Sequence, residues 1–111
     1  LGVLNGRLRE NVVHFNSVAA AVEKLKAGDL AAVMGPRSEI EQALGKDNRF
    51  TLEVVQMPEL KINSWPIGMA VKAEETALAD TVGEALRVLQ KNGTVASIFA
   101  RHGITYVQPT L

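Results

Sequence analysis

Short apolar runs separated by turn residues recur along this chain. Val and Ile are frequent in several of the runs, and "LAAVM" at 30–34 is apolar throughout, which is typical of a strand buried on both faces of a parallel sheet. In "WPIGMAVKA", apolar residues alternate with small or polar ones, as in a strand with one buried face. The pattern predicts strands at 1–4, 12–15, 30–34, 51–57 and 65–73.

Longer segments between these runs carry apolar residues at helical spacing. In the first, Asn16 or Ser17 is placed to cap the helix, Val18, Val22 and Leu25 share one face, and Gly28 is placed to end it. A second helix is expected to start at the S-x-x-E motif of Ser38–Glu41, a capping box, and to end at Gly45.

Two further helices are predicted near the end of the chain. Residues 76–92 carry Leu78, Val82, Leu86 and Leu89 at near-helical spacing, with Gly93 beyond the end. Thr94 is expected to cap a last helix that Gly103 ends, and the residues after it are expected to be extended. Because strands and helices alternate, we expect an α/β fold with an open, mostly parallel sheet flanked by helices.

Composition and charge narrow the classes of function. The chain has 111 residues, 12 Lys and Arg against 12 Asp and Glu, and no cysteine. One domain of ordinary size is therefore expected, without the basic field that nucleic-acid binding requires and without disulfides. No apolar run approaches the roughly 20 residues that span a bilayer, so we expect a protein that is not embedded in a membrane. The first residues lack the pattern of a secretory signal, so we expect any such signal to have been removed or omitted.

Motifs for catalysis, metals and cofactors are missing from the sequence. The two histidines, His14 and His102, are far apart and belong to no metal-ligand motif, and no serine lies in G-x-S-x-G. Neither G-x-G-x-x-G nor a P-loop sequence occurs. We therefore expect no catalytic residue, no metal and no cofactor.

Two turns have the chemistry of a site for an anionic ligand. Each follows an expected strand and joins a permissive turn to an arginine, and their residues are Asn5, Gly6 and Arg7 in one and Gly35, Pro36 and Arg37 in the other. Ligands of open α/β sheets collect at the carboxyl ends of the strands, and an arginine there can hold a carboxylate. The alternative is that both arginines are solvated loop charges.

Two longer segments carry a family resemblance. "HFNSVAAAVEKLKAGDLAAVMG" and "WPIGMAVKAEETALADTVGEALRVLQKNGTVASIFARHG" together resemble the second half of family 3 extracellular solute-binding proteins, the periplasmic receptors of polar amino-acid ABC importers. The resemblance implies a type II periplasmic-binding-protein lobe. It places most of the second lobe at 1–64, and a crossing strand with the last helices, which would pack on a first lobe, at 65–111.

The resemblance also implies a function and its partners. The chain would be the periplasmic component that delivers a small-molecule ligand, a small polar solute that is anionic or amino-acid-like, to an ABC transporter permease, with a missing first lobe or a partner chain supplying the other wall of the site. Pro36 stands where such receptors carry a ligand-binding aspartate, and Arg7 where they carry a threonine. These differences indicate a more anionic or a non-amino-acid solute. The alternative is a receptor-like sensory or accessory domain without a transport role, and an enzyme is the least favoured reading.

Overall fold

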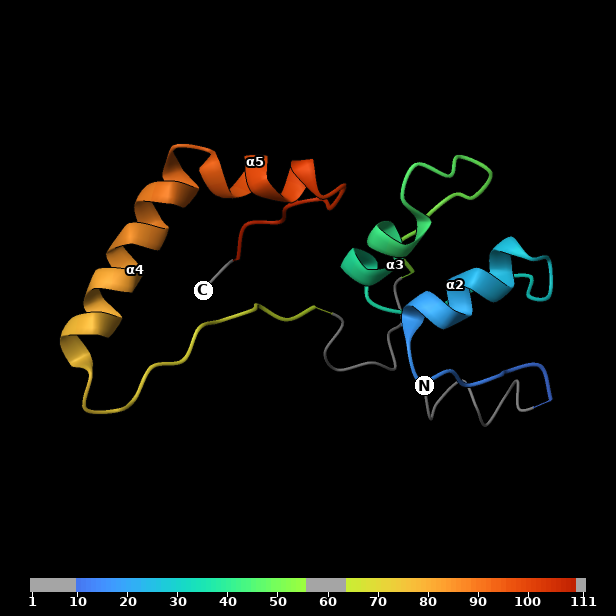
Figure 1. Ribbon diagram of the computed structural model, residues 1–111, viewed down its shortest axis with the longest axis horizontal. Coiled ribbons are helices and arrows are strands. Elements are labelled where there is room, and N and C mark those ends of the chain that lie inside the picture. Colours follow the sequence, from blue (N-terminus) through green and yellow to red (C-terminus); the bar gives the residue numbers. More distant parts are fainter. Residues whose placement is uncertain (1–9, 56–63, 110–111) are drawn as a thin grey trace. The chain divides into compact units, whose positions relative to one another are not determined.

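The computed structural model describes residues 10–55 and 64–109, and the chain divides into two compact units, 1–63 and 64–111. The first unit contains α2 (Val18–Lys26) and α3 (Arg37–Leu44), which pack against each other. The second contains α4 (Thr76–Lys91) and α5 (Thr94–Arg101), which also pack together (Figure 1). Each unit is therefore built around one pair of helices.

The residues that the structure describes form no strand, so the expected α/β fold is wrong. The segments 12–15, 30–34, 51–55 and 65–73 are irregular, and the expected strand at 1–4 and the end of the one at 51–57 lie outside the described residues. A type II lobe with a parallel sheet is thereby contradicted. The physical reason is that a strand exists only when its N–H and C=O groups pair with a neighbouring strand, whereas alternation of apolar residues reports only a tendency to be buried.

Exposure of the apolar segments supports this correction. In the segment expected to be a strand at 65–73, Ile67 is 85% exposed and Met69 is 67% exposed. Val54 in the other segment is 63% exposed. The burial on which the prediction of strands relied is therefore absent from these segments.

The α2 helix begins and ends as its sequence predicts. Ser17 has extended backbone dihedrals, and its Oγ accepts a hydrogen bond of 3.1 Å from the Ala20 N–H. At the other end, Gly28 has a φ of 84°, and the N–H groups of Gly28 and Asp29 donate to the carbonyls of Leu25 and Lys24. These two bonds form a Schellman motif, which satisfies carbonyls that the helix leaves free.

The start of α3 differs from the prediction. The helix begins at Arg37 with Pro36 as its N-cap, and no side-chain hydrogen bond caps it, so Ser38 lies within the first turn and forms no capping box. Proline suits a position next to the first turn because its φ is already helical and no intrahelical partner is needed there. Gly45, with a φ of 60°, ends the helix as expected.

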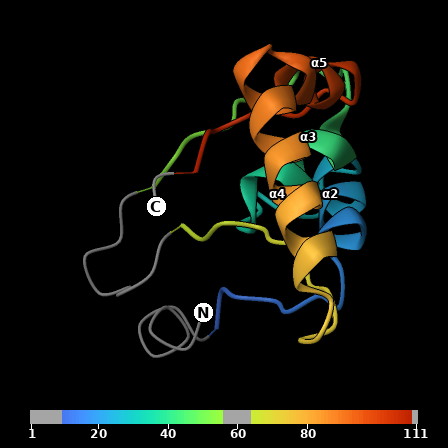
Figure 2. The same cartoon turned by 90° about the vertical axis from the view of Figure 1, so that its left-hand side faces the viewer.

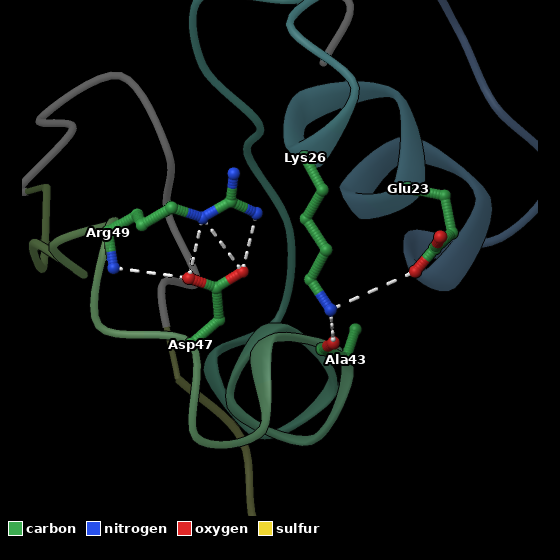
Figure 3. Close-up of polar contacts among 5 residues, drawn as sticks. All are labelled: Glu23, Lys26, Ala43, Asp47 and Arg49. Atoms are coloured by element: carbon green, nitrogen blue, oxygen red, sulfur yellow. Dashed lines mark hydrogen bonds and ion pairs between the residues drawn. The ribbon is translucent and has the colours of Figure 1, made fainter.

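Contacts between α2 and α3 make the small core of the first unit. Ala21 and Val22 are the buried hydrophobic residues in the described part of the chain, and Val22 has no exposed surface. Lys26 Nζ donates a 2.9 Å hydrogen bond to the Ala43 carbonyl and lies 3.8 Å from Glu23 Oε1 (Figure 3). Because Ala43 is in the last turn of α3, this lysine occupies a carbonyl that the helix itself cannot pair.

The α4 and α5 helices are joined by a tight turn at Gly93. This glycine has a φ of 82° and is the N-cap of α5, so Thr94 is the first residue of the helix and not its cap, contrary to the prediction. Asn92 Oδ1 instead accepts the Thr94 N–H at 3.0 Å. In Figure 2, α5 lies across the C-terminal end of α4.

The residues after α5 turn back onto its own unit. Gly103, with a φ of 70°, makes a second Schellman motif, in which the Ile104 N–H donates to the Phe99 carbonyl. The Tyr106 ring meets the Phe99 ring edge-on, with centroids 5.2 Å apart, and the Tyr106 hydroxyl accepts a 3.3 Å hydrogen bond from Gln90 of α4. The segment after α5 thus ties both helices of the unit together.

Candidate functional site

The structure describes one of the two turns that are expected to hold a ligand. Asn5, Gly6 and Arg7 lie outside the described residues. Gly35, Pro36 and Arg37 form the entry to α3, where Arg37 Nε donates a 3.1 Å hydrogen bond to Glu41 Oε1 one turn further along the helix. Ligand binding at either turn stays a prediction, and the guanidinium of Arg37 is directed along its own helix.

The turn at Gly35 lies directly against the start of α2. A Cβ on Gly35 would come within 3.0 Å of Val18 Cγ2 and 3.9 Å of Ile40 Cδ1. Only a residue without a side chain allows so close an approach without movement of its neighbours. Gly35 therefore helps to bring the N-terminal end of α2 and the first turn of α3 together.

An open hollow of about 610 Å³ lies beside this contact, inside the first unit. Its lining comes from the approach to α2, its first residues and one face of α3, and consists of Phe15, Asn16, Ser17, Val18, Ala19, Glu39, Gln42 and Ala43. Phe15, Val18 and Ala43 are half-buried and give an apolar floor, whereas the polar side chains around them are exposed. This volume is in the range of roughly 300 to 1,000 Å³ that small-molecule sites occupy.

The two sides of the hollow have opposite electrostatic character. The N-terminus of α2 carries the partial positive charge of a helix end, and its first turn contains no acidic residue to compensate that charge. On the α3 side, Glu39 contributes a carboxylate and Gln42 an amide. A negative group is therefore favoured beside Ser17 and Val18, and a positive group beside Glu39.

A separate charged cluster follows α3 and has a structural role. Arg49 donates to both carboxylate oxygens of Asp47, at 2.7 Å from Nη2 to Oδ2 and 3.0 Å from Nε to Oδ1 (Figure 3). The hydrogen bonds from the Arg49 side chain are the main cause that lowers the pKa of Asp47 to about 2, and the same pairing raises the pKa of Arg49. The guanidinium also lies 5.1 Å from the centroid of the Phe50 ring. These contacts all join residues of the loop that follows α3.

Metal-ligand clusters and membrane-spanning helices are both absent from the residues that the structure describes. No group of three or more His, Cys, Asp or Glu residues there is arranged to hold a metal ion. Within the same residues, none of the helices has the length and apolar character needed to cross a bilayer.

None of the residues that line the hollow is predicted from the sequence to bind a ligand. Ser17 was recognised as a helix cap, but a cap with no acidic residue in the following turn was also a signal for an anion-favouring helix end. Glu39, Gln42 and Ala43 lie at i, i+3 and i+4 on α3, so their shared face was readable as well. The missing information was that this face of α3 lies opposite the start of α2, which depends on tertiary packing.

Comparison with known proteins adds no family to this picture. No protein-family model, no curated protein and no solved structure matches the chain.

Proposed function

We propose that this protein is a binding component for a small polar solute, with the hollow between α2 and α3 as part of its binding surface. The solute class that fits the hollow best is amino-acid-like, carrying a carboxylate and an ammonium group, in place of the more anionic or non-amino-acid solute that Pro36 and Arg7 indicate. We further propose that the protein is a periplasmic receptor that delivers this solute to an ABC transporter permease, as the resemblance of the sequence implies. In this role it binds the solute without catalysing a reaction.

The observation that carries the proposal is the charge arrangement of the hollow. Its lining combines the start of α2, which has no acidic residue in its first turn, with the carboxylate of Glu39 on α3. A solute carboxylate would accept hydrogen bonds at the helix end, and a solute ammonium group would donate to Glu39. A zwitterion satisfies both sides at once, whereas a simple dicarboxylate would be repelled by Glu39.

The hollow supplies one wall of a complete site. Asn16, Ser17, Ala19, Glu39 and Gln42, which make up most of its lining, are all exposed. A compact site normally buries about 70 to 90% of its ligand, and exposed lining residues cannot do so. We therefore propose that a second wall comes from another lobe or a partner chain, and that the 111 residues alone bind the solute with Kd of roughly 1 mM or weaker.

Calorimetry and amide NMR on the 111-residue chain test this proposal. The panel contains amino acids, dicarboxylates and simple amines at up to millimolar concentration. We expect amino acids to give the largest response, with shifts of the amides around Ser17 and Glu39. Glu39→Gln removes the negative partner of the ammonium group and should weaken binding about five- to tenfold, whereas the control Glu53→Gln, an exposed acid outside the hollow, should not change it.

Two results would count against the proposal. Equal weakening by Glu39→Gln and Glu53→Gln would mean that the effect is one of net charge and not of the hollow. Submicromolar binding by the monomeric chain would contradict the claim that the hollow is only one wall.

A further inference from the structure

The α4 helix carries an apolar stripe that its packing against α5 does not cover. Leu78 is 47% exposed, Val88 is 52% exposed and Leu89 is 39% exposed. Together with Thr81 and Ala85 they recur every three or four residues, which places them on one face. The half-buried residues of the helix, Val82, Gly83, Leu86 and Gln90, lie on the side turned toward the rest of the unit.

A shallow groove follows this stripe. It has a volume of about 620 Å³ and is lined by Asp80, Thr81, Glu84, Ala85, Val88 and Leu89. Its surface is formed mainly by the apolar residues and the hydrocarbon parts of the polar ones. A groove of this kind along a single helix is suited to the side chains of another helix.

One edge of the stripe is charged, and the sign of the charge changes along the helix. At about 100° per residue, Asp80, Glu84, Arg87 and Lys91 all project on the same side of the stripe. Along this edge the two acids, Asp80 and Glu84, precede the two bases, Arg87 and Lys91. All four side chains are exposed, and Glu84 and Arg87 also form an ion pair of 3.0 Å within the helix.

We propose that the α4 stripe binds the α4 stripe of a second copy of this chain, with the two helices antiparallel. In an antiparallel pair, the charged edge of one helix faces the charged edge of the other helix, and the two edges run in opposite directions. Centred between Ala85 and Leu86, this arrangement brings Glu84 opposite Arg87 of the second copy and Asp80 opposite its Lys91. The interface is isologous, so each of these pairings occurs twice.

The shape of the stripe agrees with this arrangement. The small side chain of Ala85 lies near the centre of the stripe, where two helices cross most closely, and the larger exposed side chains of Leu78 and Leu89 lie toward its ends. A parallel pair would instead place the charged edge opposite the uncharged edge of Val82 and Leu86. Of the two arrangements, only the antiparallel pair places each acid opposite a base of the other copy, and this complementarity argues for a second copy as the partner.

The small area of the α4 stripe limits the expected affinity of the dimer. A helix of 16 residues is roughly 24 Å long, so one helix face is smaller than a standard protein interface. We therefore expect a weak dimer, with Kd of the order of 100 μM. The proposal is independent of solute binding, which concerns the other unit.

A charge exchange between two variants tests the arrangement. Asp80→Lys with Glu84→Lys makes the edge wholly basic, and Arg87→Glu with Lys91→Glu makes it wholly acidic. Sedimentation equilibrium from 10 μM to 1 mM should show each double variant dimerising at least about tenfold more weakly than the unchanged chain, and an equimolar mixture of the two recovering a heterodimer.

Two further variants separate the interface from folding and from net charge. Val88→Ser removes exposed apolar surface from the stripe without changing charge and should weaken the dimer about fivefold or more. Lys46→Glu, an exposed substitution in the other unit, should leave it unchanged. Circular dichroism confirms that each variant keeps its helices. A chain that is monomeric at 1 mM, or charge variants that dimerise alone as well as the unchanged chain does, would overturn the proposal.

Discussion

The α2–α3 pair and the α4–α5 pair are both short helical assemblies, but different interactions stabilise them. The first pair buries Ala21 and Val22, and a hydrogen bond from Lys26 to the Ala43 carbonyl joins its two helices. The second pair has no fully buried side chain among its described residues, and its helices are connected by the turn at Gly93. The first unit therefore depends on packing, and the second on turn geometry and the contacts of Tyr106.

This difference has a consequence for function. Packing of α2 on α3 places a helix end and a carboxylate around one hollow, which is the arrangement proposed to bind a solute. Packing of α4 on α5 leaves an apolar stripe of α4 exposed, which is the surface proposed to bind a second copy. The two units thus offer two kinds of surface, one for a small molecule and one for a protein.

Truncation of a valine in each unit should give the largest contrast. Val22 has no exposed surface, so Val22→Ala removes buried methyl groups and leaves a cavity, with an expected loss of about 2 to 3 kcal/mol of unfolding free energy. Val88 is 52% exposed, so Val88→Ala should change stability by less than about 0.5 kcal/mol. Urea unfolding followed by circular dichroism measures both, and equal losses would contradict the described difference in burial.

Replacement of the helix-ending glycines should have the next largest effect and should be similar in the two units. Gly28→Ala and Gly103→Ala each force a residue with a Cβ into a positive φ, at an expected cost of about 1 to 2 kcal/mol. Gly68→Ala is the control, because Gly68 has neither a positive φ nor an atom within 4 Å of a Cβ, and a neutral or slightly stabilising effect is expected. Thermal unfolding of the three variants gives the comparison.

Loss of a helix cap should have a smaller effect, confined to the first unit. Ser17→Ala removes the hydrogen bond to the Ala20 N–H and should cost about 1 kcal/mol. Ser38→Ala, within the first turn of α3, should cost less than about 0.5 kcal/mol because no capping bond is lost. A larger loss for Ser38→Ala than for Ser17→Ala would contradict the described start of α3 and support the capping box that the sequence predicts.

The smallest effect should be a change in the titration of Asp47. Its pKa is lowered from the ordinary value of 3.8 to about 2, so its contribution to stability is present above pH 3.8 and is lost as the pH falls toward 2. Arg49→Gln removes the main cause and should raise the pKa of Asp47 toward its ordinary value, while the backbone N–H of residue 49 continues to lower it. NMR of the side-chain carboxyl carbon during acid titration measures the pKa directly, and an unchanged low value in Arg49→Gln would assign the shift to another group.

The helices were predictable because their signals are local. Apolar residues at helical spacing, the Ser17 cap and the glycines at 28, 45, 93 and 103 located all four helices of the described residues. The predicted cap lies two positions too late in α3 and one position too late in α5, because a serine or threonine near a helix start can occupy the cap or the first turn. Local preference alone does not distinguish these positions.

The strands and the site were not predictable in the same way. Runs such as 30–34 and 65–73 have the composition of strands, but pairing requires a second segment at the right place and register, which no single run contains. Likewise, the sequence predicts a turn that enters a helix at Gly35, Pro36 and Arg37. It does not predict that Gly35 lies against Val18 and brings α2 beside α3. In both cases the sequence does not show which distant parts of the chain lie in contact.

The most direct test of this account is an amide NMR titration of the chain with an amino acid. We expect the shifted amides to cluster at 15–20 and 39–43, with those of 64–109 unchanged at constant protein concentration. Shifts spread evenly over both units, or confined to α4 and α5, would contradict the assignment of solute binding to the α2–α3 hollow.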